Sequence, residues 1–465
     1  MKIRRISFIE AASPGLHIFS KYPIPRLGAV LLCTMLREKG YEAKAFIEDI
    51  AEPDWGFIES SDLVCISSIT STAPRAYRIA KQARALNIPV ILGGVHPTFM
   101  PEEALSYADF VIRGEAERSL FELLGHLEKG APSPEAIKGL SYRDPGGRMH
   151  HNPAPEFIQD LDGLPHPDLT LVHKWNPAYV YPVATSRGCP YDCKFCSVIR
   201  MFGRKYRFKS IEATLKELRY AASAAKATKF IVDDNFAANK NRTREILNRM
   251  LSEGIRMKWA AQVRTDIARD PDLLRLMADA GCDTLHIGFE SINNATLEAY
   301  NKRQTREDII TCIKTVKDHG IHIHGMFALG SDSDDVNTIR ETGDFAIELG
   351  LDTMQIMPLT PLPGTPLLDE MRESNRLLHT DWSKYDVQHV VFKPLLMTPA
   401  VLQIEAFKAM ARFYSWKYIL RCLTQLDFKY AAIGLFGKRT VDKCLKAAAP
   451  YLESLEFQRP ETPSL

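Results

Sequence analysis

Short apolar runs alternate with helical patterns in two separate blocks of this sequence, one before residue 150 and one after residue 181. Runs of this length, bounded by turn residues and separated by helices, are typical of buried parallel strands joined by helical crossovers. A chain with this pattern is expected to form layered α/β domains, not a helical bundle or a β-sandwich. We therefore predict an α/β protein with two sheets of parallel strands.

The first block, residues 1–150, predicts a doubly wound, Rossmann-like parallel sheet. The expected strands are Ile3–Ile9, Glu42–Ile47, Leu63–Ser67, Val90–Leu92 and Phe110–Ile112. Helical patterns lie between them, at Leu27–Lys39, Ala73–Ala85 and Ser119–Leu127. Such folds bind ligands at the carboxyl ends of their strands, where the pair Gly93 and Gly94 would let a ligand approach the backbone.

The second block, residues 181–370, predicts a partial (β/α)6 barrel, and a proline-rich linker at 151–180 separates it from the first. Its expected strands are Val183–Ser186, Lys229–Asp233, Lys258–Gln262, Thr284–Phe289, His322–Leu329 and Met354–Met357. Active sites of such barrels lie at the carboxyl ends of the strands. Residues 371–465 are expected to be helical.

Bulk properties indicate the broad class of the protein. A length of 465 residues suggests about three domains, at a prior of roughly 150 residues per domain. The formal net charge of +2 gives no reason to expect a nucleic-acid partner. No apolar run approaches the ~18 residues that a membrane-spanning helix needs, and the basic start lacks the apolar region of a signal peptide. We therefore expect a cytoplasmic protein.

Three of the nine cysteines lie in one short segment, Cys189, Cys193 and Cys196, with the spacing C-x₃-C-x₂-C. In a large chain without secretion signals, such a cluster indicates metal binding and not a disulfide framework. Three thiolates would leave one iron of a four-iron cluster open, as a catalytic metal centre requires. A zinc site or a ferredoxin-type cluster would need a fourth ligand, and both remain alternatives on spacing alone.

The cysteine segment follows the first strand of the expected barrel, and an aromatic residue stands directly before its last cysteine. In both respects it resembles the cysteine loop of the radical S-adenosylmethionine (SAM) superfamily. The resemblance implies a [4Fe–4S] cluster on Cys189, Cys193 and Cys196. It also implies that SAM binds the open iron through its amino and carboxylate groups and yields a 5′-deoxyadenosyl radical. An external electron donor such as flavodoxin or ferredoxin would supply the electron.

The same resemblance implies a SAM-binding set, one aromatic residue in the cysteine loop and five residues at or near strand ends: Phe195, Asp233, Asp234, Arg264, Glu290 and Gly325. Each has a plainer interpretation, because an aspartate there can cap a helix and an arginine can form a surface ion pair. His322 and His324 alternate with apolar residues, so we expect both on one face of their strand. If that face is the barrel lumen, they are candidates for substrate contact.

Residues 1–150 resemble the cobalamin-binding domain that is fused to many radical SAM enzymes. The resemblance implies contacts with cobalamin from residues after successive strands: Asp49, Ser67, Thr70, Gly93 and Gly94. The motif D-x-H-x-x-G, whose histidine ligates cobalt, is absent, and the loop Glu48–Gly56 contains no histidine. We therefore expect cobalamin to bind without a histidine ligand from the protein.

These resemblances together predict cobalamin-dependent methylation of an unreactive carbon in a small hydrophobic substrate, such as a lipid. The alternatives are cobalamin-free radical bond formation, oxidation or rearrangement, and a non-catalytic cobalamin or redox sensor. Basic and aromatic residues interleave between Ile404 and Cys444. This pattern predicts either contact with an anionic membrane surface or a helix that packs its aromatic face on the barrel.

Overall fold

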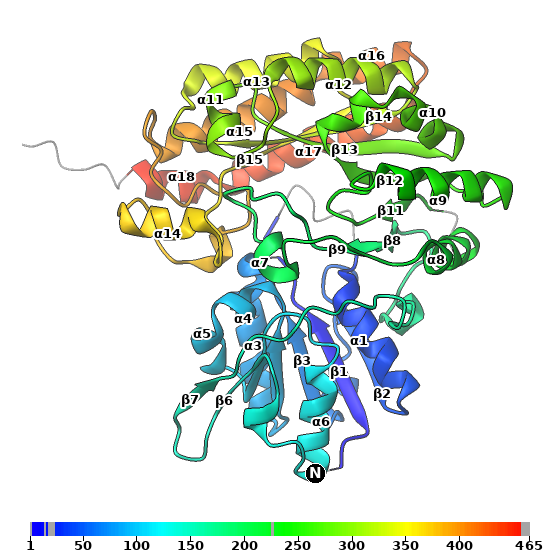
Figure 1. Cartoon of the computed structure of the whole chain (residues 1–465). Helices are drawn as coiled ribbons and strands as arrows, with labels where there is room; N and C mark the ends of the chain where they lie inside the picture. The colour runs from blue at the N-terminus through cyan, green and yellow to red at the C-terminus, as the bar shows by residue number, and fades with distance from the viewer. Residues whose placement is uncertain (1, 14, 17–23, 225–226, 457–465) are drawn as a thin grey trace, which may run out of the picture.

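The computed structural model describes residues 2–13, 15–16, 24–224 and 227–456. Two sheets stand one above the other, with the amino-terminal sheet below and the barrel above it (Figure 1). The carboxyl-terminal helices lie along the barrel. The predicted fold class, an α/β chain with a helical carboxyl-terminal region, is confirmed.

The amino-terminal sheet has five parallel strands in the order β2-β1-β3-β4-β5. These are β1 (Arg5–Glu10), β2 (Glu42–Ile47), β3 (Leu63–Ser67), β4 (Val90–Gly93) and β5 (Phe110–Ile112). On β3, Val64 and Ile66 pack into a core on one face, and Cys65 packs into a second core on the other. Burial of both faces explains why these strands read as continuous apolar runs.

Helices cover both faces of this sheet: α1 (Leu27–Glu38), α2 (Trp55–Glu59), α3 (Ala73–Ala85), α4 (Val95–Phe99), α5 (Pro101–Leu105) and α6 (Ser119–Lys129). An antiparallel hairpin that the sequence analysis did not predict, β6 (Leu140–Arg143) and β7 (Met149–His151), extends the sheet beyond β5. Polar residues interrupt both short strands, Leu140-Ser141-Tyr142-Arg143 and Met149-His150-His151, so they lack the continuous apolar run seen in β3.

The segment 152–180 runs in extended form from this sheet to the barrel, with one 3₁₀ turn at Leu169–Leu171. It lies along the edge strand β2, where the backbone N–H of His173 donates to the carbonyl of Ala45 at 2.8 Å. Leu169 and Val172 belong to a buried core that continues from the sheet into the barrel. The connection is therefore packed against both domains.

The barrel sheet has six parallel strands in the order β15-β14-β13-β12-β11-β8. These are β8 (Tyr181–Val183), β11 (Lys229–Ile231), β12 (Trp259–Val263), β13 (Cys282–Glu290), β14 (His322–Leu329) and β15 (Thr353–Pro358). On β13, Leu285, Ile287 and Phe289 are fully buried against the outer helices. The alternate residues, including His286, face the lumen.

Six main helices form the outer layer: α8 (Ile211–Ala224), α9 (Lys240–Ser252), α10 (Pro271–Asp279), α11 (Asn294–Ala299), α12 (Arg306–Asp318) and α13 (Val336–Glu348). The first barrel strand ends at Val183, three residues earlier than predicted. Ser186 and Arg187 instead form β9, which pairs antiparallel with β10 (Arg207–Phe208). This small ribbon and helix α7 (Val198–Phe202) frame the cysteine segment.

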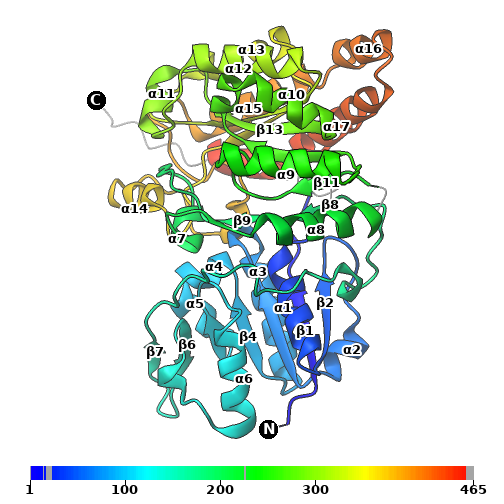
Figure 2. The ribbon, with the colours of Figure 1, turned by 45° about the vertical axis from the view of Figure 1, so that its right-hand side comes forward.

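The carboxyl-terminal region contains α14 (Pro366–Glu373), α15 (Pro399–Phe413), α16 (Trp416–Thr424), α17 (Phe428–Ala447) and α18 (Ala449–Glu456). Between α14 and α15 the chain is mostly irregular, with one 3₁₀ turn, η5 (Trp382–Lys384). Trp382 donates its indole N–H to Glu103 of the amino-terminal domain at 2.9 Å. Helix α16 lies at the outer edge of the molecule (Figure 2). No helix in the described part of the chain is long and apolar enough to span a membrane.

Candidate functional site

The three cysteines lie on a loop between β9 and α7, directly beyond the first barrel strand. Gly188 begins this loop with a φ of +87°, and a Cβ atom there would clash with the carbonyl oxygen of Lys205. The backbone N–H of Cys189 then donates to the carbonyl of Gly203 at 3.2 Å. The loop is therefore folded by its own backbone, with a conformation that glycine favours at its start.

All three thiols are free, with Cys193 buried and Cys189 and Cys196 half-buried. Burial raises the pKa of Cys189, and it raises the pKa of Cys196 to about 12. Each of these two thiols also interacts electrostatically with the other cysteines of the loop. The thiols of Cys189 and Cys196 are consequently protonated at neutral pH, and a bound metal cluster must displace those protons.

Arg264 and Phe195 hold the cysteine loop against the barrel. The guanidinium carbon of Arg264 lies 3.8 Å from the ring centroid of Tyr191, which belongs to the loop. The same guanidinium donates to the carbonyl of Lys302 at 2.6 Å. Phe195 meets Tyr300 edge to face, with 5.1 Å between the ring centroids. Of the residues predicted for SAM binding, Phe195 therefore lies within the cysteine loop and Arg264 borders it.

Asp233 and Asp234, adjacent in sequence, have different surroundings. The carboxylate of Asp233 is buried and accepts bonds from the hydroxyl groups of Thr185 and Ser186, each at 2.6 Å, and from the backbone of Thr185. Both residues lie on the wall of a cavity, but Asp234 accepts no hydrogen bond from the described residues. Desolvation by the surrounding protein, aided by the charge of Asp233, raises the pKa of Asp234 to about 7. Asp234 is thus the better placed of the two to meet a ligand.

Glu290 ends β13 in a left-handed conformation, with a φ of +65°. Its carboxylate pairs with the ammonium group of Lys302 at 2.7 Å, and both side chains are about 9% exposed. Gly325 lies in the middle of β14, where a Cβ atom would be 2.7 Å from Leu351 and 3.2 Å from Phe289. Gly325 therefore packs against the outer layer, away from the strand end at which the sequence analysis expected it.

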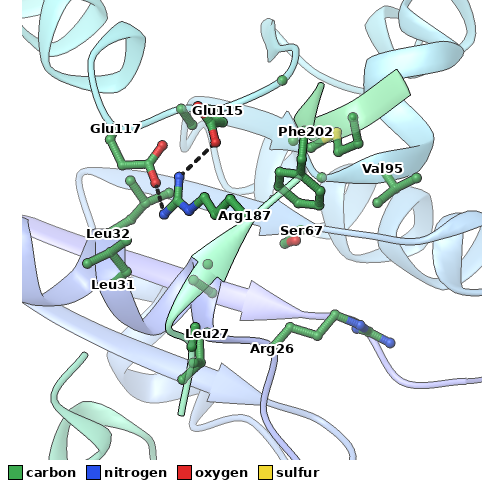
Figure 3. Close-up of a pocket in the computed structure, with 18 of the residues that line it drawn as sticks. Arg26, Leu27, Leu31, Leu32, Ser67, Val95, Glu115, Glu117, Arg187 and Phe202 are labelled. Atoms are coloured by element: carbon green, nitrogen blue, oxygen red, sulfur yellow. Dashed lines mark hydrogen bonds and ion pairs between the residues drawn. The ribbon is translucent and has the colours of Figure 1, made fainter. Parts of the chain in front are cut away.

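A cavity of about 450 Å³ lies between the carboxyl edge of the amino-terminal sheet and the cysteine loop. Ser67, Gly93 and Gly94 line it from the sheet side, and Gly188 and Asp234 line it from the barrel side. Leu27, Leu31, Val95 and Phe202 make much of its wall apolar (Figure 3).

Asp49 and Thr70, also predicted as cobalamin contacts, are not among the residues lining this cavity. Asp49 follows β2, which is the outer edge strand, whereas the cavity lies over the middle of the sheet. Thr70 begins a 3₁₀ turn that packs against η5 of the carboxyl-terminal region.

The sheet edge of this cavity is shaped for close approach of a ligand. Gly94 has a φ of +93°, and a Cβ atom there would be 2.7 Å from the carbonyl oxygen of Ser68. The hydroxyl group of Ser68 is buried and has no hydrogen-bond partner among the described residues. A glycine cradle beside an unpaired hydroxyl group fits a polar group of a bound cofactor.

A buried network of charges joins the amino-terminal domain to the cysteine loop. Arg187 pairs with Glu115 at 3.0 Å and with Glu117 at 2.6 Å, as Figure 3 shows. Arg207 pairs with Glu115 at 2.8 Å. Burial alone would raise the pKa of Glu115, but the bonds from Arg207 and Arg187 outweigh it and leave the pKa lowered.

The pairings within this network, and the pairing of Lys302 with Glu290, were not predicted from the sequence. Glu115 and Arg187 are 72 residues apart, and no local pattern pairs them. Only the charges could have indicated this pairing, because two glutamates follow β5 and an arginine precedes the first cysteine by two residues.

Comparisons with known proteins agree with this geometry. Residues 183–354 match the model of the radical SAM superfamily, and residues 18–124 match that of the B12 binding domain. The chain is 33% identical to an uncharacterized methyltransferase of Pyrococcus horikoshii, over 84% of this chain and 88% of the relative. It is 32% identical to the bacteriochlorophyllide d C-12(1)-methyltransferase of Chlorobaculum tepidum, over 75% of each chain. It is 26% identical to the hopanoid C-2 methylase of Rhodopseudomonas palustris, over 69% of this chain and 59% of the relative.

Two solved structures share the fold. The cobalamin-dependent SAM radical enzyme OxsB with aqua-cobalamin bound matches 95% of this chain and 72% of its own, with a TM-score of 0.71 and 19% identity. The radical SAM methyltransferase TsrM from Kitasatospora setae, with cobalamin and a [4Fe–4S] cluster bound, matches 80% of this chain and 78% of its own, with a TM-score of 0.66 and 19% identity. This chain belongs to the radical SAM superfamily, in the group whose members carry an amino-terminal B12 binding domain.

Proposed function

We propose that this protein is a cobalamin-dependent radical SAM methylase that methylates an unreactive carbon of a hydrophobic substrate. One observation carries the proposal, which is that a single cavity is shared by the carboxyl edge of the B12 binding sheet and the cysteine loop. Ser67 and Gly94 line it from one side, and Gly188 and Asp234 from the other. Groups bound by the two domains would meet in this cavity.

The residues present fit the cofactors of the family. Cys189, Cys193 and Cys196 would hold the [4Fe–4S] cluster, and the cradle at Ser68 and Gly94 would take part of cobalamin. When bound, the cluster and SAM supply one-electron chemistry, and cobalamin supplies the methyl group.

Within the barrel, the residues predicted for SAM divide into two groups by their surroundings. Asp234 faces the cavity and can accept a hydrogen bond from an ammonium group when it is ionised. Phe195 lies within the cysteine loop, and Arg264 borders it. Asp233 and Glu290 are already engaged by protein groups, so they position the strand ends.

The chain's own apolar residues support a hydrophobic substrate. Leucines of α1, together with Met201 and Phe202 of α7, give the cavity an apolar lining. The relatives described above act on a bacteriochlorophyllide and a hopanoid, which are both hydrophobic molecules. We infer a lipid or tetrapyrrole-like substrate, and an external flavodoxin or ferredoxin as electron donor.

A second feature supports contact with a membrane surface. Five exposed large apolar residues lie on α16 and the turn after it, and we call them the α16 patch: Trp416, Leu420, Leu423, Leu426 and Phe428. Lys417, Arg421 and Lys429 accompany them in the same segment. An amphipathic helix with this composition suits an anionic membrane surface, from which a lipid substrate would be drawn.

The decisive experiment is anaerobic reconstitution with iron, sulfide and hydroxocobalamin, followed by reduction and incubation with methyl-deuterated SAM. The expected result is formation of 5′-deoxyadenosine and S-adenosylhomocysteine, with deuterated methyl groups in a hydrophobic molecule of a cell extract. Replacing all three cysteines by alanine should abolish the 5′-deoxyadenosine.

Other outcomes point to the alternatives. Production of 5′-deoxyadenosine by a protein that retains no corrin would indicate cobalamin-free radical chemistry. Retention of corrin without any SAM cleavage would indicate a sensor.

A further inference from the structure

A second cavity, of about 370 Å³, lies at the end of the barrel opposite to the cysteine loop. Its wall includes residues at or near the amino ends of five strands: Val180, Thr228, Ala260, Thr284 and Thr353. The cysteine loop follows the carboxyl end of β8, so the two cavities are separate. A volume of this size is within the range of small-molecule sites, roughly 300–1,000 Å³.

Helix α17 covers this cavity. Tyr430, Ile433 and Phe436 line it from the helix, and Phe230 lines it from the barrel. The hydroxyl groups of Tyr430 and Thr284 are 3.1 Å apart, which ties the helix to the barrel sheet. The cavity is therefore preformed and largely apolar.

Two histidines of the barrel strands lie in the wall of this cavity, and they differ in their partners. His324 is bonded through both ring nitrogens, to Thr353 at 2.8 Å and to Gln355 at 3.1 Å. His286 contacts the rings of Phe230 and His324, at 5.0 and 4.6 Å between centroids. Neither ring nitrogen of His286 has a hydrogen-bond partner among the residues that the structure describes.

The imidazole of His286 is neutral at physiological pH. Burial, and secondarily the neighbouring His324, lower its pKa well below the ordinary value. A neutral imidazole presents one N–H donor and one nitrogen acceptor, and in His286 neither has a partner among the described residues. A hydroxyl group can satisfy either of them, because it both donates and accepts.

The charges around the cavity indicate an uncharged ligand. Two charged residues, Lys429 and Asp283, lie in its wall, and they pair with each other at 2.5 Å. Asp283 also pairs with Lys258 at 3.8 Å. A charged ligand would lose its hydration without finding a free counter-charge in this wall.

We propose that this cavity is a binding site for an uncharged, largely apolar alcohol, whose hydroxyl group bonds to His286. The apolar part of the ligand lies against Phe230, Ile433 and Phe436. Helix α17 begins at Phe428, a member of the α16 patch, so the cavity adjoins the most apolar surface segment of the described chain. The site is distinct from the cavity shared by the two domains, and it does not depend on the proposed methylation.

The test uses the reconstituted protein and 1-octanol as the probe, titrated by isothermal calorimetry under anaerobic conditions without turnover. We expect one site per chain. Di-n-butyl ether, an isomer of 1-octanol that only accepts hydrogen bonds, should bind about tenfold more weakly, and octylammonium should not bind. Each lost hydrogen bond accounts for roughly a tenfold change in affinity.

Two variants locate the site. His286→Phe should weaken octanol binding at least about tenfold, and Ile433→Trp should abolish binding by filling the cavity. His150→Phe, which changes a histidine on β7 of the other domain, is the matched control and should bind octanol as the wild type does.

The proposal is overturned if octanol does not bind, if octylammonium binds equally well, or if both cavity variants keep the wild-type affinity. If His286→Phe does not fold, Ile433→Trp and the three probe molecules still test the proposal.

Discussion

Arg187, two residues before the first cysteine of the loop, donates a hydrogen bond to Glu115 of the amino-terminal domain over 3.0 Å. Glu115 is 6% exposed, and it also accepts two bonds from Arg207. The two arginines lie on the two strands of the ribbon that frames the cysteine loop. The position of the loop relative to the B12 binding domain is therefore fixed through one buried carboxylate.

Replacing Glu115 by glutamine should destabilise the protein and reduce its cluster content. The change leaves Arg187 and Arg207 buried with one negative charge fewer, and breaking a buried pair typically costs about 3–5 kcal/mol. Glu122→Gln is the matched control, because its partner Arg118 is 81% exposed and water screens such a pair. Thermal unfolding and iron content are measured on both. Equal values for the two variants would contradict the role of Glu115.

Gly94→Ala should weaken corrin binding while the cluster stays intact. The residue has a φ of +93°, and the added methyl group would be 2.7 Å from the carbonyl oxygen of Ser68. Holding a non-glycine residue in this conformation costs about 1–3 kcal/mol, and relief of the clash would move the loop that lines the cavity. Gly130→Ala is the control, since that glycine also has a positive φ but nothing lies within 4 Å of its Cβ position. Corrin retention after gel filtration is the measurement. Normal retention by Gly94→Ala would show that this cradle does not hold the cofactor.

The sequence predicted the elements whose pattern is local. Leu63–Ser67 was predicted with its observed bounds, because a strand buried on both faces is a continuous apolar run. The hairpin β6–β7 was missed because its strands are short and interrupted by polar residues. The turn residues Asp144-Pro145-Gly146-Gly147 between them were the available signal.

The candidate site was predictable only in part. The spacing of the cysteines located the loop, but the pairing of Arg187 with Glu115 joins residues far apart in sequence and leaves no local trace. The face of the strand on which Gly325 lies follows from the alternation of residues along β14. His322 and His324 alternate with it on one strand, so histidines that face the lumen place Gly325 on the outer face.

The stability of the apoprotein should depend on pH through Asp234. Its folded-state pKa is raised from 3.8 to about 7, so the folded protein resists ionisation that the unfolded chain accepts readily. Stability is therefore lost as the pH rises from about 4 to 7, and Asp234→Asn removes this loss. The melting temperature of Asp234→Asn minus that of the wild type should increase between pH 5 and pH 8.

Asp335→Asn serves as the control for this pH dependence. Backbone hydrogen bonding at the start of α13 lowers the pKa of Asp335, so it stays ionised in both states above pH 5. Its difference in melting temperature should be constant from pH 5 to pH 8. A constant difference for Asp234→Asn as well would contradict the raised pKa.

The α16 patch predicts binding to anionic membranes. Trp416, Leu420, Leu426 and Phe428 are each at least 59% exposed, and burial of such side chains contributes at most about 1.5–3 kcal/mol each. Nearby basic residues add about 1 kcal/mol each at an anionic surface.

The wild type should sediment with vesicles containing phosphatidylglycerol, and binding should weaken as salt screens the charges. Leu420→Glu combined with Leu426→Glu should abolish it, because both side chains point to solvent and the fold does not need them. Leu395→Glu combined with Leu396→Glu alters two leucines of similar exposure elsewhere and should bind normally. If the wild type stays in the supernatant, or if both double variants lose binding equally, this surface does not contact a membrane.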